Sequence, residues 1–600
     1  MNFNGLTVVI TGAGGGLGKS YALLFASRGA NVVVNDFNKD AAQTVVDEIT
    51  ATGGKAVSNN SSATDGAAVI QSALDAFGTV HILVNNAGFL RDKGFKKMTD
   101  AEWDQIIEIH LKAAFACTKA AWPIFRKQKF GRVVSTASAA GLYGNFGQAN
   151  YSAAKMGLVG FSKTLALEGA KYNIRAVTIA PIAASQMTAT VMPPEMLANL
   201  QPTLVAPFVV AVSHPDAPAE VSGKIFEVGA GYIAEVRWQR SAGAIFKTDA
   251  SFTPSAVKAR FAEITDFSQP QYPKSSTDFD AQGFVTKAGS APTNPQSSSP
   301  VGFAGKTVII TGAGAGLGRT YALMYARLGA NVVVNDVSEK AANAVVEEIV
   351  SAGGKATAVV CSAEDGDKIV KTALDAFGGV HVLVANAGIL RDKSFQAVTE
   401  KEWDAVLAVH LRGTYKCAKA VWPIFQDQKY GRIVTTASQV GMYGNFGQAN
   451  YSTAKAAIIG LMRTLSIEGK KFNILANAIA PSAGTAMTKA IWTPEAVEAL
   501  KPDYIAPLVG YLTSEDNVET SGSVFEILGG WIAQSRWQRA YGYSFPVKGK
   551  PPFTPEDVLG KWEAFTKFDD RATYPSTTSE ALEQMVANFE NAGEEIKAKL

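Results

Sequence analysis

Short apolar runs alternate with amphipathic segments along the first half of the chain. Five runs have the length of buried strands, at residues 6–10, 31–35, 81–84, 132–135 and 174–179. Between them, residues 17–28 and 40–51 repeat apolar positions at helical spacing. Continuously apolar strands separated by helices predict a parallel sheet covered by helices on both faces. This is the doubly wound, Rossmann-type α/β fold, which binds ligands beyond the carboxyl ends of its strands.

The second half of the chain repeats the first at an interval of 300 residues. Residues 11–14 return at 311–314, and residues 145–152 return without a change at 445–452. One residue is lost late in the repeat, so that Trp238 corresponds to Trp537. A repeat of this length is a whole-domain duplication. The sequence therefore predicts two tandem doubly wound domains.

A segment without apolar periodicity separates the two units. Residues 286–300 read TKAGSAPTNPQSSSP, a composition typical of a flexible linker. We therefore expect domain A at residues 1–285 and domain B at residues 301–600. Each unit also carries a C-terminal extension, from about residues 235 and 534, in which an Arg-Trp-Gln-Arg string precedes aromatic residues and prolines. The extensions either wall a substrate pocket or join the two halves, and we favour the second interpretation.

Composition excludes several classes of protein. Of the 600 residues, 47% are hydrophobic and 18% are charged, as in ordinary globular domains. A formal net charge of +3 gives no indication of binding to nucleic acid or to a membrane surface. We find no secretory signal and no apolar run long enough for a membrane span. Cys117, Cys361 and Cys417 are scattered, which is typical of plain thiols in a reducing compartment, and we expect no metal site.

A glycine-rich loop follows the first predicted strand. Residues 11–18 read TGAGGGLG and lead directly into a predicted helix. Glycines allow a tight turn, let backbone N–H groups approach a pyrophosphate, and let the helix pack closely on the sheet. The sequence therefore predicts a dinucleotide site in each half. The residues expected to contact the cofactor are Gly12, Gly14, Gly16, Leu17 and Gly18, with their counterparts Gly312, Gly314, Gly316, Leu317 and Gly318.

An aspartate stands at the end of the second predicted strand in each half, Asp36 and Asp336. A carboxylate at this place accepts hydrogen bonds from the adenosine ribose hydroxyls and repels a 2′-phosphate. The residues that follow are Phe-Asn and Val-Ser, so that no arginine is present to receive such a phosphate. The alternative is an aspartate that only begins a turn. We predict NAD rather than NADP at both sites.

Ser138, Tyr151 and Lys155 have the spacing S-x12-Y-x3-K, which Ser438, Tyr451 and Lys455 repeat. A tyrosine and a lysine four residues apart share one face of a helix. Removing the proton of a secondary alcohol requires a base, and free tyrosine has a pKa of about 10. A nearby ammonium favours the phenolate, while the serine can orient the substrate oxygen. A plain amphipathic helix explains the tyrosine–lysine pair alone, but the full set predicts a hydride-transfer site in each half.

With these motifs in place, the chain resembles the short-chain dehydrogenase/reductase family. The resemblance implies that Tyr151, Lys155, Tyr451 and Lys455 also contact the cofactor. It places the nicotinamide beside the segment that contains Pro181, Met187 and Thr188. It also implies further cofactor contacts from Ser62, Asn86, Ala87 and Gly88, and from Ser362, Asn386, Ala387 and Gly388.

One departure from the family concerns the helix before the serine strand. The family often has an asparagine there, and the matching positions in this chain hold His110 and His410. Either each imidazole holds a water molecule in a proton relay to the lysine, or it hydrogen-bonds the backbone of a bent helix. The sequence leaves both interpretations open.

The resemblance is closer to a peroxisomal branch of the family in which two dehydrogenase units stand in tandem. The strings that carry it are GFLRDK at 88–93, GILRDK at 388–393, YGNFGQANYSAAK at 143–155, and RWQR at 237–240 and 536–539. It implies NAD-dependent oxidation of (3R)-3-hydroxyacyl-CoA to 3-ketoacyl-CoA in fatty-acid β-oxidation. The terminal Ala598, Lys599 and Leu600 resemble a peroxisomal address. In this branch a hydratase segment follows the dehydrogenase units, and we expect no hydratase activity from this chain.

Two other functions stay open at this point: reduction of steroid or acyl-carrier-protein substrates, and a scaffold role for one of the domains. Members of the family commonly pair through helices around the catalytic one. Two such domains on one short linker have an effective concentration on the order of millimolar. We therefore expect the halves to pair as an intramolecular pseudo-dimer, with further homodimerisation left open.

Overall fold

The computed structural model describes residues 1–184, 193–484, 494–548 and 552–593. In the first half, parallel strands pair in the order β3-β2-β1-β4-β5-β6-β7. They are β1 (Thr7–Thr11), β2 (Asn31–Asn35), β3 (Lys55–Asn59), β4 (Ile82–Asn85), β5 (Gly131–Thr136), β6 (Ile174–Pro181) and β7 (Ile225–Gly229). All five predicted strands are confirmed. The sequence analysis did not identify β3, because its residues are only half-buried and carry no apolar run.

The second half repeats this sheet in the order β12-β11-β10-β13-β14-β15-β16. Its strands are β10 (Thr307–Thr311), β11 (Asn331–Asp336), β12 (Lys355–Val360), β13 (Val382–Ala385), β14 (Gly431–Thr436), β15 (Ile474–Ser482) and β16 (Val524–Leu528). The strand order is that of a doubly wound nucleotide-binding sheet. The predicted fold class is therefore confirmed in both halves.

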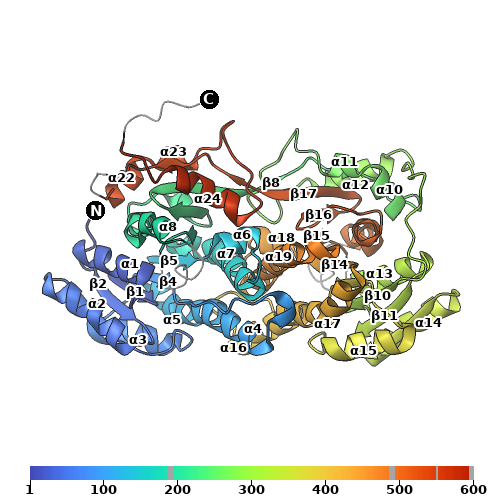
Figure 1. The fold of residues 1–600 in the computed structure, drawn as a ribbon, viewed down its shortest axis with the longest axis horizontal. Coiled ribbons are helices and arrows are strands. Elements are labelled where there is room, and N and C mark those ends of the chain that lie inside the picture. The colour runs from blue at the N-terminus through green and yellow to red at the C-terminus, as the bar shows by residue number, and fades with distance from the viewer. Residues whose placement is uncertain (185–192, 485–493, 549–551, 594–600) are drawn as a thin grey trace.

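Two long antiparallel strands join the sheets, as the centre of Figure 1 shows. Strand β8 (Tyr232–Arg240) pairs with β7, and β17 (Trp531–Arg539) pairs with β16. The two strands also pair with each other, so that Trp238 lies opposite Trp537. With the short strands β9 (Ala244–Ile245) and β18 (Tyr543–Ser544), the described residues form one sheet of eighteen strands.

Helices cover both faces of the sheet. Val9 and Val33 face a layer with α3, α5 and α7, whereas Val8 and Val32 face a layer with α1, α2 and α9. The helices of the first half are α1 (Gly16–Ser27), α2 (Lys39–Ala51), α3 (Gly66–Phe77), α4 (Asp100–Ile107), α5 (Ala113–Gln128), α6 (Ala139–Tyr143), α7 (Ala149–Gly169), α8 (Pro194–Asn199), α9 (Ala206–Ser213), α10 (Pro254–Ala259), α11 (Phe261–Ile264) and α12 (Ala281–Ser290). A π-helical turn, η2 (Glu108–Lys112), connects α4 to α5.

The second half has an equivalent set of helices. They are α13 (Gly316–Arg327), α14 (Glu339–Ser351), α15 (Gly366–Phe377), α16 (Glu400–Leu407), α17 (Gly413–Gln428), α18 (Gln439–Tyr443), α19 (Ala449–Gly469), α20 (Pro494–Ala499), α21 (Ala506–Thr513), α22 (Pro555–Gly560), α23 (Trp562–Thr566) and α24 (Thr578–Ala587). A second π-helical turn, η7 (Ala408–Arg412), connects α16 to α17. None of the described helices is long and apolar enough to cross a membrane.

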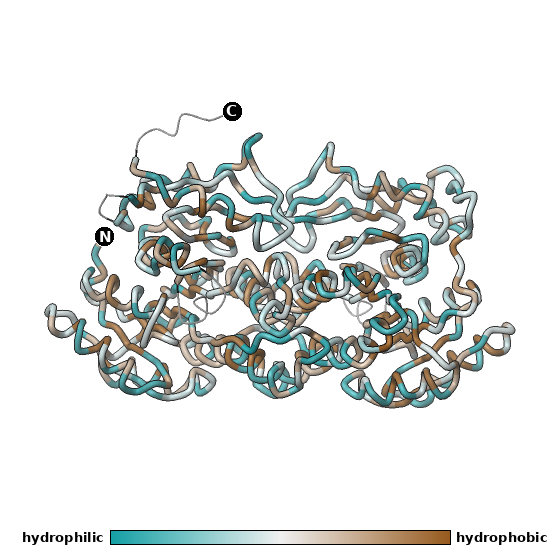
Figure 2. Tube along the Cα trace, viewed as in Figure 1, coloured by the Kyte–Doolittle hydropathy of each residue, from teal (hydrophilic) through white to brown (hydrophobic). Residues whose placement is uncertain are grey.

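The inner helical layers of the two halves form one continuous apolar core, in which α7 lies against α19. Figure 2 shows hydrophobic segments concentrated in the sheets and in these inner helices. A Cβ atom on Gly160 would lie 2.4 Å from the Ser452 carbonyl oxygen, and one on Gly460 would lie 2.2 Å from that of Ser152. Glycine is therefore required where the two helices cross.

The C-terminal extensions are exchanged between the halves. Phe246 and Phe252 of the first extension pack into the outer core of the second half, and Phe553 and Phe565 of the second pack into that of the first. The predicted linker 286–300 is helical up to Ser290, where α12 ends. The domain boundaries at residues 285 and 301 therefore stay a prediction from the sequence.

Each extension also sends an arginine into the other half. Arg539 Nη1 lies 2.8 Å from Glu227 Oε2, and Arg240 Nη1 lies 3.0 Å from Glu526 Oε2. All four side chains are at most 3% exposed. A buried ion pair of this kind adds little net stability over an apolar pair, but removing one partner leaves the other charge buried without compensation.

We predict that Arg539→Met lowers the free energy of unfolding by about 3–5 kcal/mol, because the buried Glu227 carboxyl group then loses its charged partner. Denaturant titration followed by tryptophan fluorescence measures the change. The matched control is Arg571→Met, which breaks the more exposed pair with Asp569 and should cost no more than about 1 kcal/mol. Equal unfolding midpoints for the two variants would show that the buried pair does not hold the halves together.

Candidate active sites

The glycine-rich loop between β1 and α1 is shaped by close backbone contacts. Gly12 has a φ of +64°, and a Cβ atom on it would lie 2.8 Å from Ala87 Cα. A Cβ atom on Gly18 would lie 2.2 Å from the Gly12 carbonyl oxygen, so that α1 packs directly on the loop. Gly15, the residue before α1, provides no side-chain cap. The amino end of the helix is therefore open to an anion.

The segment after β4 holds this loop in place. Asn86 Nδ2 donates to the carbonyl oxygens of Thr11 and Gly12, both at 3.1 Å. Thr11 Oγ1 accepts from the backbone N–H groups of Asn86 and Ala87, both at 3.0 Å. Asn86 and Ala87 therefore support the loop from the next strand of the sheet. The sequence analysis missed Thr11, although a threonine precedes the first glycine in both halves.

Asp36 lies just beyond β2, facing the glycine-rich loop. Its Oδ2 accepts from Gly14 N at 2.9 Å, and its Oδ1 accepts from Asn38 N at 2.9 Å. Each carboxylate oxygen keeps a lone pair for another donor. In the second half, Asp336 Oδ2 accepts from Gly314 N at 3.0 Å. The aspartate and the loop are therefore one unit in both halves.

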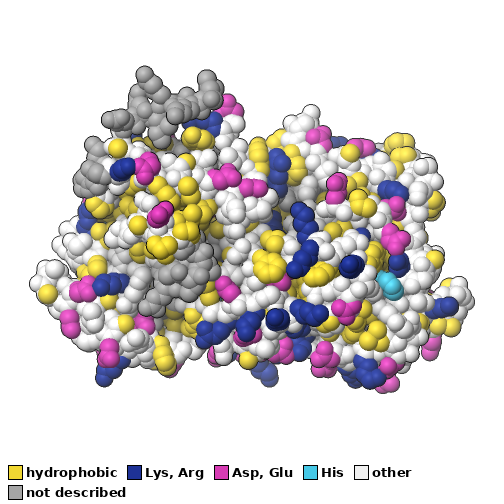
Figure 3. Space-filling view, in the orientation of Figure 1, with side chains coloured by type: hydrophobic (Ala, Val, Ile, Leu, Met, Phe, Trp, Pro, Cys, Tyr) yellow, Lys and Arg dark blue, Asp and Glu magenta, His cyan; other side chains and the backbone are white. Residues whose placement is uncertain are grey.

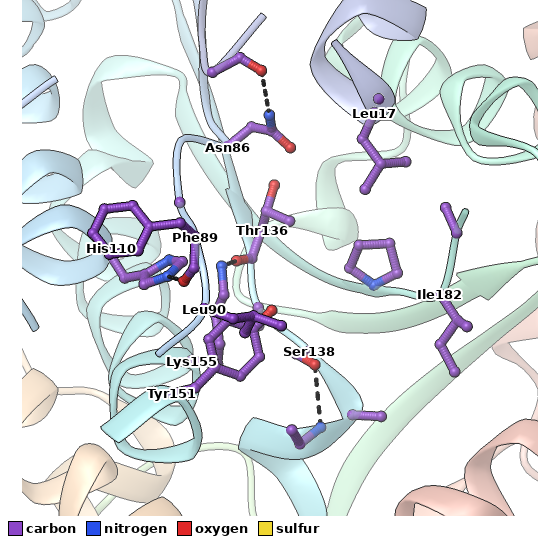
Figure 4. A pocket seen from close by; sticks show the side chains of 18 of the residues that line it. Leu17, Asn86, Phe89, Leu90, His110, Thr136, Ser138, Tyr151, Lys155 and Ile182 are labelled. Carbon is purple, nitrogen blue, oxygen red and sulfur yellow. Dashed lines mark hydrogen bonds between the residues drawn. The ribbon is translucent and has the colours of Figure 1, made fainter. Parts of the chain in front are cut away.

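A cavity of about 650 Å³ brings most of the predicted residues of the first half together. Figure 4 shows Leu17 and Asn86 at one end and Ser138, Tyr151 and Lys155 at the other. Its lining includes Gly12, Gly14, Gly16, Leu17, Asp36, Asn86, Gly88, His110, Ser138, Tyr151, Lys155 and Pro181. The cavity therefore extends from the glycine-rich loop to the Ser–Tyr–Lys set, as a dinucleotide and a substrate together would require.

Not every predicted residue lines this cavity. Gly18 and Ala87 support the glycine-rich loop from behind, and Ser62 is exposed and shares a hydrogen bond with Thr64 Oγ1 at 2.8 Å. Met187 and Thr188 lie outside the described residues, as do the three C-terminal residues. Within the described part of the chain, no group of three or more His, Cys, Asp or Glu side chains is placed to bind a metal ion.

Ser138, Tyr151 and Lys155 come from two neighbouring elements. Ser138 lies two residues beyond the end of β5 and is the N-cap residue of α6, where its Oγ accepts from Ala140 N at 3.2 Å. Tyr151 and Lys155 stand on the same face of α7, with Lys155 Nζ at 5.3 Å from the centre of the tyrosine ring. Lys155 Nζ donates to the Thr136 carbonyl oxygen at 2.6 Å, a contact visible in Figure 4. The amine is therefore anchored to β5.

Burial dominates the protonation of this pair. It raises the pKa of Tyr151 to about 12, against the lowering effect of a hydrogen bond with Ser138. Burial also lowers the pKa of Lys155 to about 7. We expected the ammonium to bring the pKa of the phenol down. In the structure the Lys155 amine is directed at a backbone carbonyl oxygen. Desolvation therefore outweighs the effect of the lysine charge on the pKa of Tyr151, and the pKa of the amine itself lies near neutral pH.

His110 lies in the π-helical turn η2, with its ring edge-on to that of Tyr151 at 5.3 Å. Burial, together with the charge of Lys155, holds the pKa of His110 well below its usual range, so that the imidazole is neutral. Nε2 lies 3.0 Å from the Phe89 carbonyl oxygen, which can only accept, so Nε2 carries the proton. Nδ1 is buried and has no hydrogen-bond partner among the described residues. Gly88 leaves the room for the ring, since a Cβ there would lie 1.9 Å from His110 Cε1.

The second half repeats these contacts closely. Lys455 Nζ donates to the Thr436 carbonyl oxygen at 2.6 Å, and Asn386 Nδ2 donates to that of Thr311 at 3.1 Å. Burial again raises the pKa of the tyrosine, Tyr451, to about 12 and lowers that of Lys455 to about 7. His410 Nε2 lies 2.8 Å from the Ile389 carbonyl oxygen. The remaining predicted residues, Ser438, Leu317, Gly316, Gly318, Ser362, Ala387 and Gly388, occupy equivalent elements.

The cavity of the first half is closed by the extension of the second. Thr578, Ser579 and Leu582 of α24 line it, and Thr578 Oγ1 donates to Asn145 Oδ1 at 3.3 Å. The second extension therefore both lines a cavity and joins the two halves. The sequence holds no local signal for this contact, because the residues that meet are 433 positions apart.

The sheet order, the glycine-rich loop and the adjoining Ser–Tyr–Lys set define an oxidoreductase of the nicotinamide-dinucleotide type. The chain belongs to the short-chain dehydrogenase family. The family model described as "short chain dehydrogenase" matches residues 6–195 and again residues 306–496.

Two fungal relatives align with both halves of the chain, and a mammalian relative aligns with about half of it. The chain is 52% identical over 602 residues to the peroxisomal hydratase-dehydrogenase-epimerase of Neurospora crassa, with 98% of this chain and 66% of that protein covered. It is 47% identical over 607 residues to the Saccharomyces cerevisiae protein of the same name, with 97% and 66% covered. The peroxisomal multifunctional enzyme type 2 of Mus musculus is 48% identical over 293 residues, with 47% of this chain and 40% of that enzyme covered. The chain thus spans 66% of the length of its two fungal relatives.

We predict that Leu582→Asp reduces kcat/KM at the first site roughly tenfold or more, because a carboxylate on the apolar wall must be desolvated when substrate binds. Steady-state NADH formation in a Tyr451→Phe background measures the first site alone. The same change in a Tyr151→Phe background isolates the second site, whose rate should be unaltered. Equal losses in the two backgrounds would mean that α24 supports the fold in general and not the first cavity.

Proposed function

We propose that the protein is an NAD-dependent (3R)-3-hydroxyacyl-CoA dehydrogenase of peroxisomal β-oxidation, with one site in each half. The observation that carries the proposal is the single cavity that joins the glycine-rich loop and Asp36 to Ser138, Tyr151 and Lys155. In the second half, Asp336 and Lys455 repeat the hydrogen bonds that Asp36 and Lys155 make to the glycine-rich loop and to the neighbouring strand.

The residues present fit a nicotinamide dinucleotide. Gly12, Gly14 and Gly18 of the glycine-rich loop have no room for side chains, and the open amino end of α1 suits the pyrophosphate. Asp36 is placed to accept from the ribose hydroxyls, and no arginine follows it or Asp336, which favours NAD over NADP. When bound, the dinucleotide supplies the hydride acceptor for the oxidation of an alcohol.

The side chains of the site divide the handling of the proton. Ser138 Oγ orients the substrate hydroxyl. The phenol oxygen of Tyr151 takes up the proton that leaves this hydroxyl and gives up its own proton, which passes on to the neutral amine of Lys155. Lys155 is the group that can accept a proton near neutral pH, because burial has lowered its pKa to about 7. His110, neutral and fixed to the Phe89 carbonyl, shapes the cavity beside Tyr151.

The cavity and its rim suit an acyl-CoA ester. Leu90, Ile182 and Leu582 provide apolar lining for an acyl chain. Lys and Arg side chains form a row across the lower middle of the face drawn in Figure 3. Next to the cavity lining, the exposed Arg91 directly follows Leu90 in the chain. The names of the two fungal relatives support a dehydrogenase activity and the peroxisome as the place of action.

We further propose that the halves act as an intramolecular pseudo-dimer with exchanged extensions. The packing of α7 against α19 and the pairing of β8 with β17 support this arrangement. Homodimerisation of the whole chain stays open.

We predict that Tyr151→Phe and Tyr451→Phe each abolish one site, with a loss of about 10²–10⁴-fold at that site, because phenylalanine cannot take up the proton. NADH absorbance with both C3 configurations of 3-hydroxyacyl-CoA esters of several lengths measures it. The double variant should be inactive, whereas each single variant should still oxidise the 3R esters at its other site.

Full activity in the double variant would refute the assigned chemistry. A reaction only with steroid or acyl-carrier-protein substrates would support the alternative dehydrogenase function. If one single variant already lacks all activity, the other domain is a scaffold.

We predict that kcat/KM for alcohol oxidation at each site rises as the pH increases through about 7. Lys155 and Lys455, whose pKa values burial lowers to about 7, are ammonium ions below this pH and accept a proton only above it. A pH profile of the Tyr451→Phe enzyme tests the first site. Lys155→Met in that background should remove the rise, whereas an unchanged profile would mean that another group controls it.

A further inference from the structure

Two loops of the first half contribute to the lining of its cavity. One follows β4 and covers residues 88–94, and the other covers residues 144–148 between α6 and α7. The loops are tied to each other, because Lys93 N donates to the Gly147 carbonyl oxygen at 2.8 Å. Their residues in the cavity lining are Gly88, Phe89, Leu90, Asn145 and Gln148.

A carboxylate of the second half holds both loops. Glu468 stands in the last turn of α19 and is only 5% exposed. Its Oε1 accepts from Gly147 N at 3.0 Å, and its Oε2 accepts from Phe95 N at 2.6 Å. Phe95 directly follows the first loop. One carboxylate therefore fixes the two loops relative to each other, with one oxygen on each.

Two further side chains of the second half bind the same segments. Lys419 Nζ, on α17, donates to the carbonyl oxygens of Phe95 at 2.6 Å and of Lys96 at 2.8 Å. Thr464 Oγ1, on α19, accepts from Asn145 N at 3.2 Å. The wall of the first cavity is thus anchored to the second half at both loops.

The first half offers the same contacts to the second. Glu168 is 4% exposed, and its Oε1 accepts from Gly447 N at 3.0 Å while its Oε2 accepts from Phe395 N at 2.6 Å. Lys119 Nζ donates to the carbonyl oxygens of Phe395 and Gln396, both at 2.8 Å. Each of α7 and α19 therefore carries the tyrosine of its own site and a carboxylate that holds the loops of the other.

The cofactor end of the first cavity is held differently. The hydrogen bonds that fix Asp36 and Asn86 there come from Gly14, Thr11 and Gly12 of the same half. A change in Glu468 or in its contacts should therefore affect the loops and leave the dinucleotide site as it is.

We propose that Glu168 and Glu468, each with its neighbouring lysine, are positioning residues for the active site of the opposite half. The inference rests on the proposed function, in which the loops face a 3-hydroxyacyl-CoA ester. Loops that are already ordered before the ester binds spare the complex the loss of conformational entropy. Their release should therefore raise KM for the ester more than it lowers kcat. An amide cannot replace the carboxylate, because its single acceptor oxygen leaves one of the two backbone N–H groups without a partner.

Glu468→Gln, measured at each site separately, tests the proposal. In the Tyr451→Phe background only the first site reacts, and we expect KM for (3R)-3-hydroxydecanoyl-CoA to rise about tenfold. We expect kcat and the KM for NAD to stay within about twofold of the Tyr451→Phe parent. In the Tyr151→Phe background all three parameters should equal those of the parent, although the substitution lies on the helix of the second site. Glu168→Gln should give the mirror image.

The pattern across the two sites separates positioning from a general loss of stability. Equal effects at both sites, an effect only at the site of the substituted half, or a fall in kcat with KM unchanged would overturn the inference. Parents that oxidise no 3R ester would instead refute the proposed function.

Thermal unfolding shows whether the glutamine variants are folded. If Glu468→Gln does not fold, Lys419→Met carries the test, because it removes the bonds to the Phe95 and Lys96 carbonyls and leaves the buried carboxylate in place. A raised KM for the ester at the first site alone supports the inference, and an unchanged KM there overturns it.

Discussion

Helices α7 and α19 cross with their backbones almost in contact, because Gly160 and Gly460 present no side chain at the crossing. The same two helices carry Tyr151 and Tyr451, each one residue before the serine whose carbonyl oxygen faces the glycine of the other helix. The position of each phenol relative to its sheet is therefore set from two sides, by its own β strands and by the helix of the other half. A change that separated the helices would disturb both sites together.

The exchange of the extensions extends this dependence to the outer layers. Phe565 of the second half packs against Phe208 and Phe226 of the first, at ring distances of 6.1 and 6.2 Å. Without it, the outer face of the first sheet would lose apolar cover, and the first cavity would lose the wall that Leu582 provides. Each half is thus complete only in the presence of the other. The two arginines that cross between the halves are buried for this reason, even though each sheet is formed by a separate part of the chain.

The parts of the site that depend on local sequence could be predicted, and the parts that depend on packing could not. The places of Asp36 and of the Ser–Tyr–Lys set in the site could be predicted from their spacing alone, because strand ends and helix faces bring these residues to one edge of the sheet. The direction of Lys155 is different, since its bond to the Thr136 carbonyl and the desolvation that lowers its pKa exist only after the helix has packed. Strand β3 escaped prediction because an edge strand needs no continuous apolar run. Leu582 escaped it because nothing near residue 582 describes a cavity formed by the other half.

Two fused units can carry different residues at equivalent positions, which a symmetric pair of identical chains cannot. Trp238 and Trp537 stack at 3.7 Å, and the Arg463 guanidinium lies 5.5 and 5.6 Å from their rings while it donates to the Leu142 carbonyl oxygen. A second arginine at the equivalent position 163 would bring another buried guanidinium toward the same stacked pair, and the two like charges would repel each other in a medium of low dielectric constant. The chain has lysine there, and Lys163 Nζ turns to the Gly223 carbonyl oxygen at 3.2 Å. Because the two halves are encoded separately, one centrally placed cation can serve both.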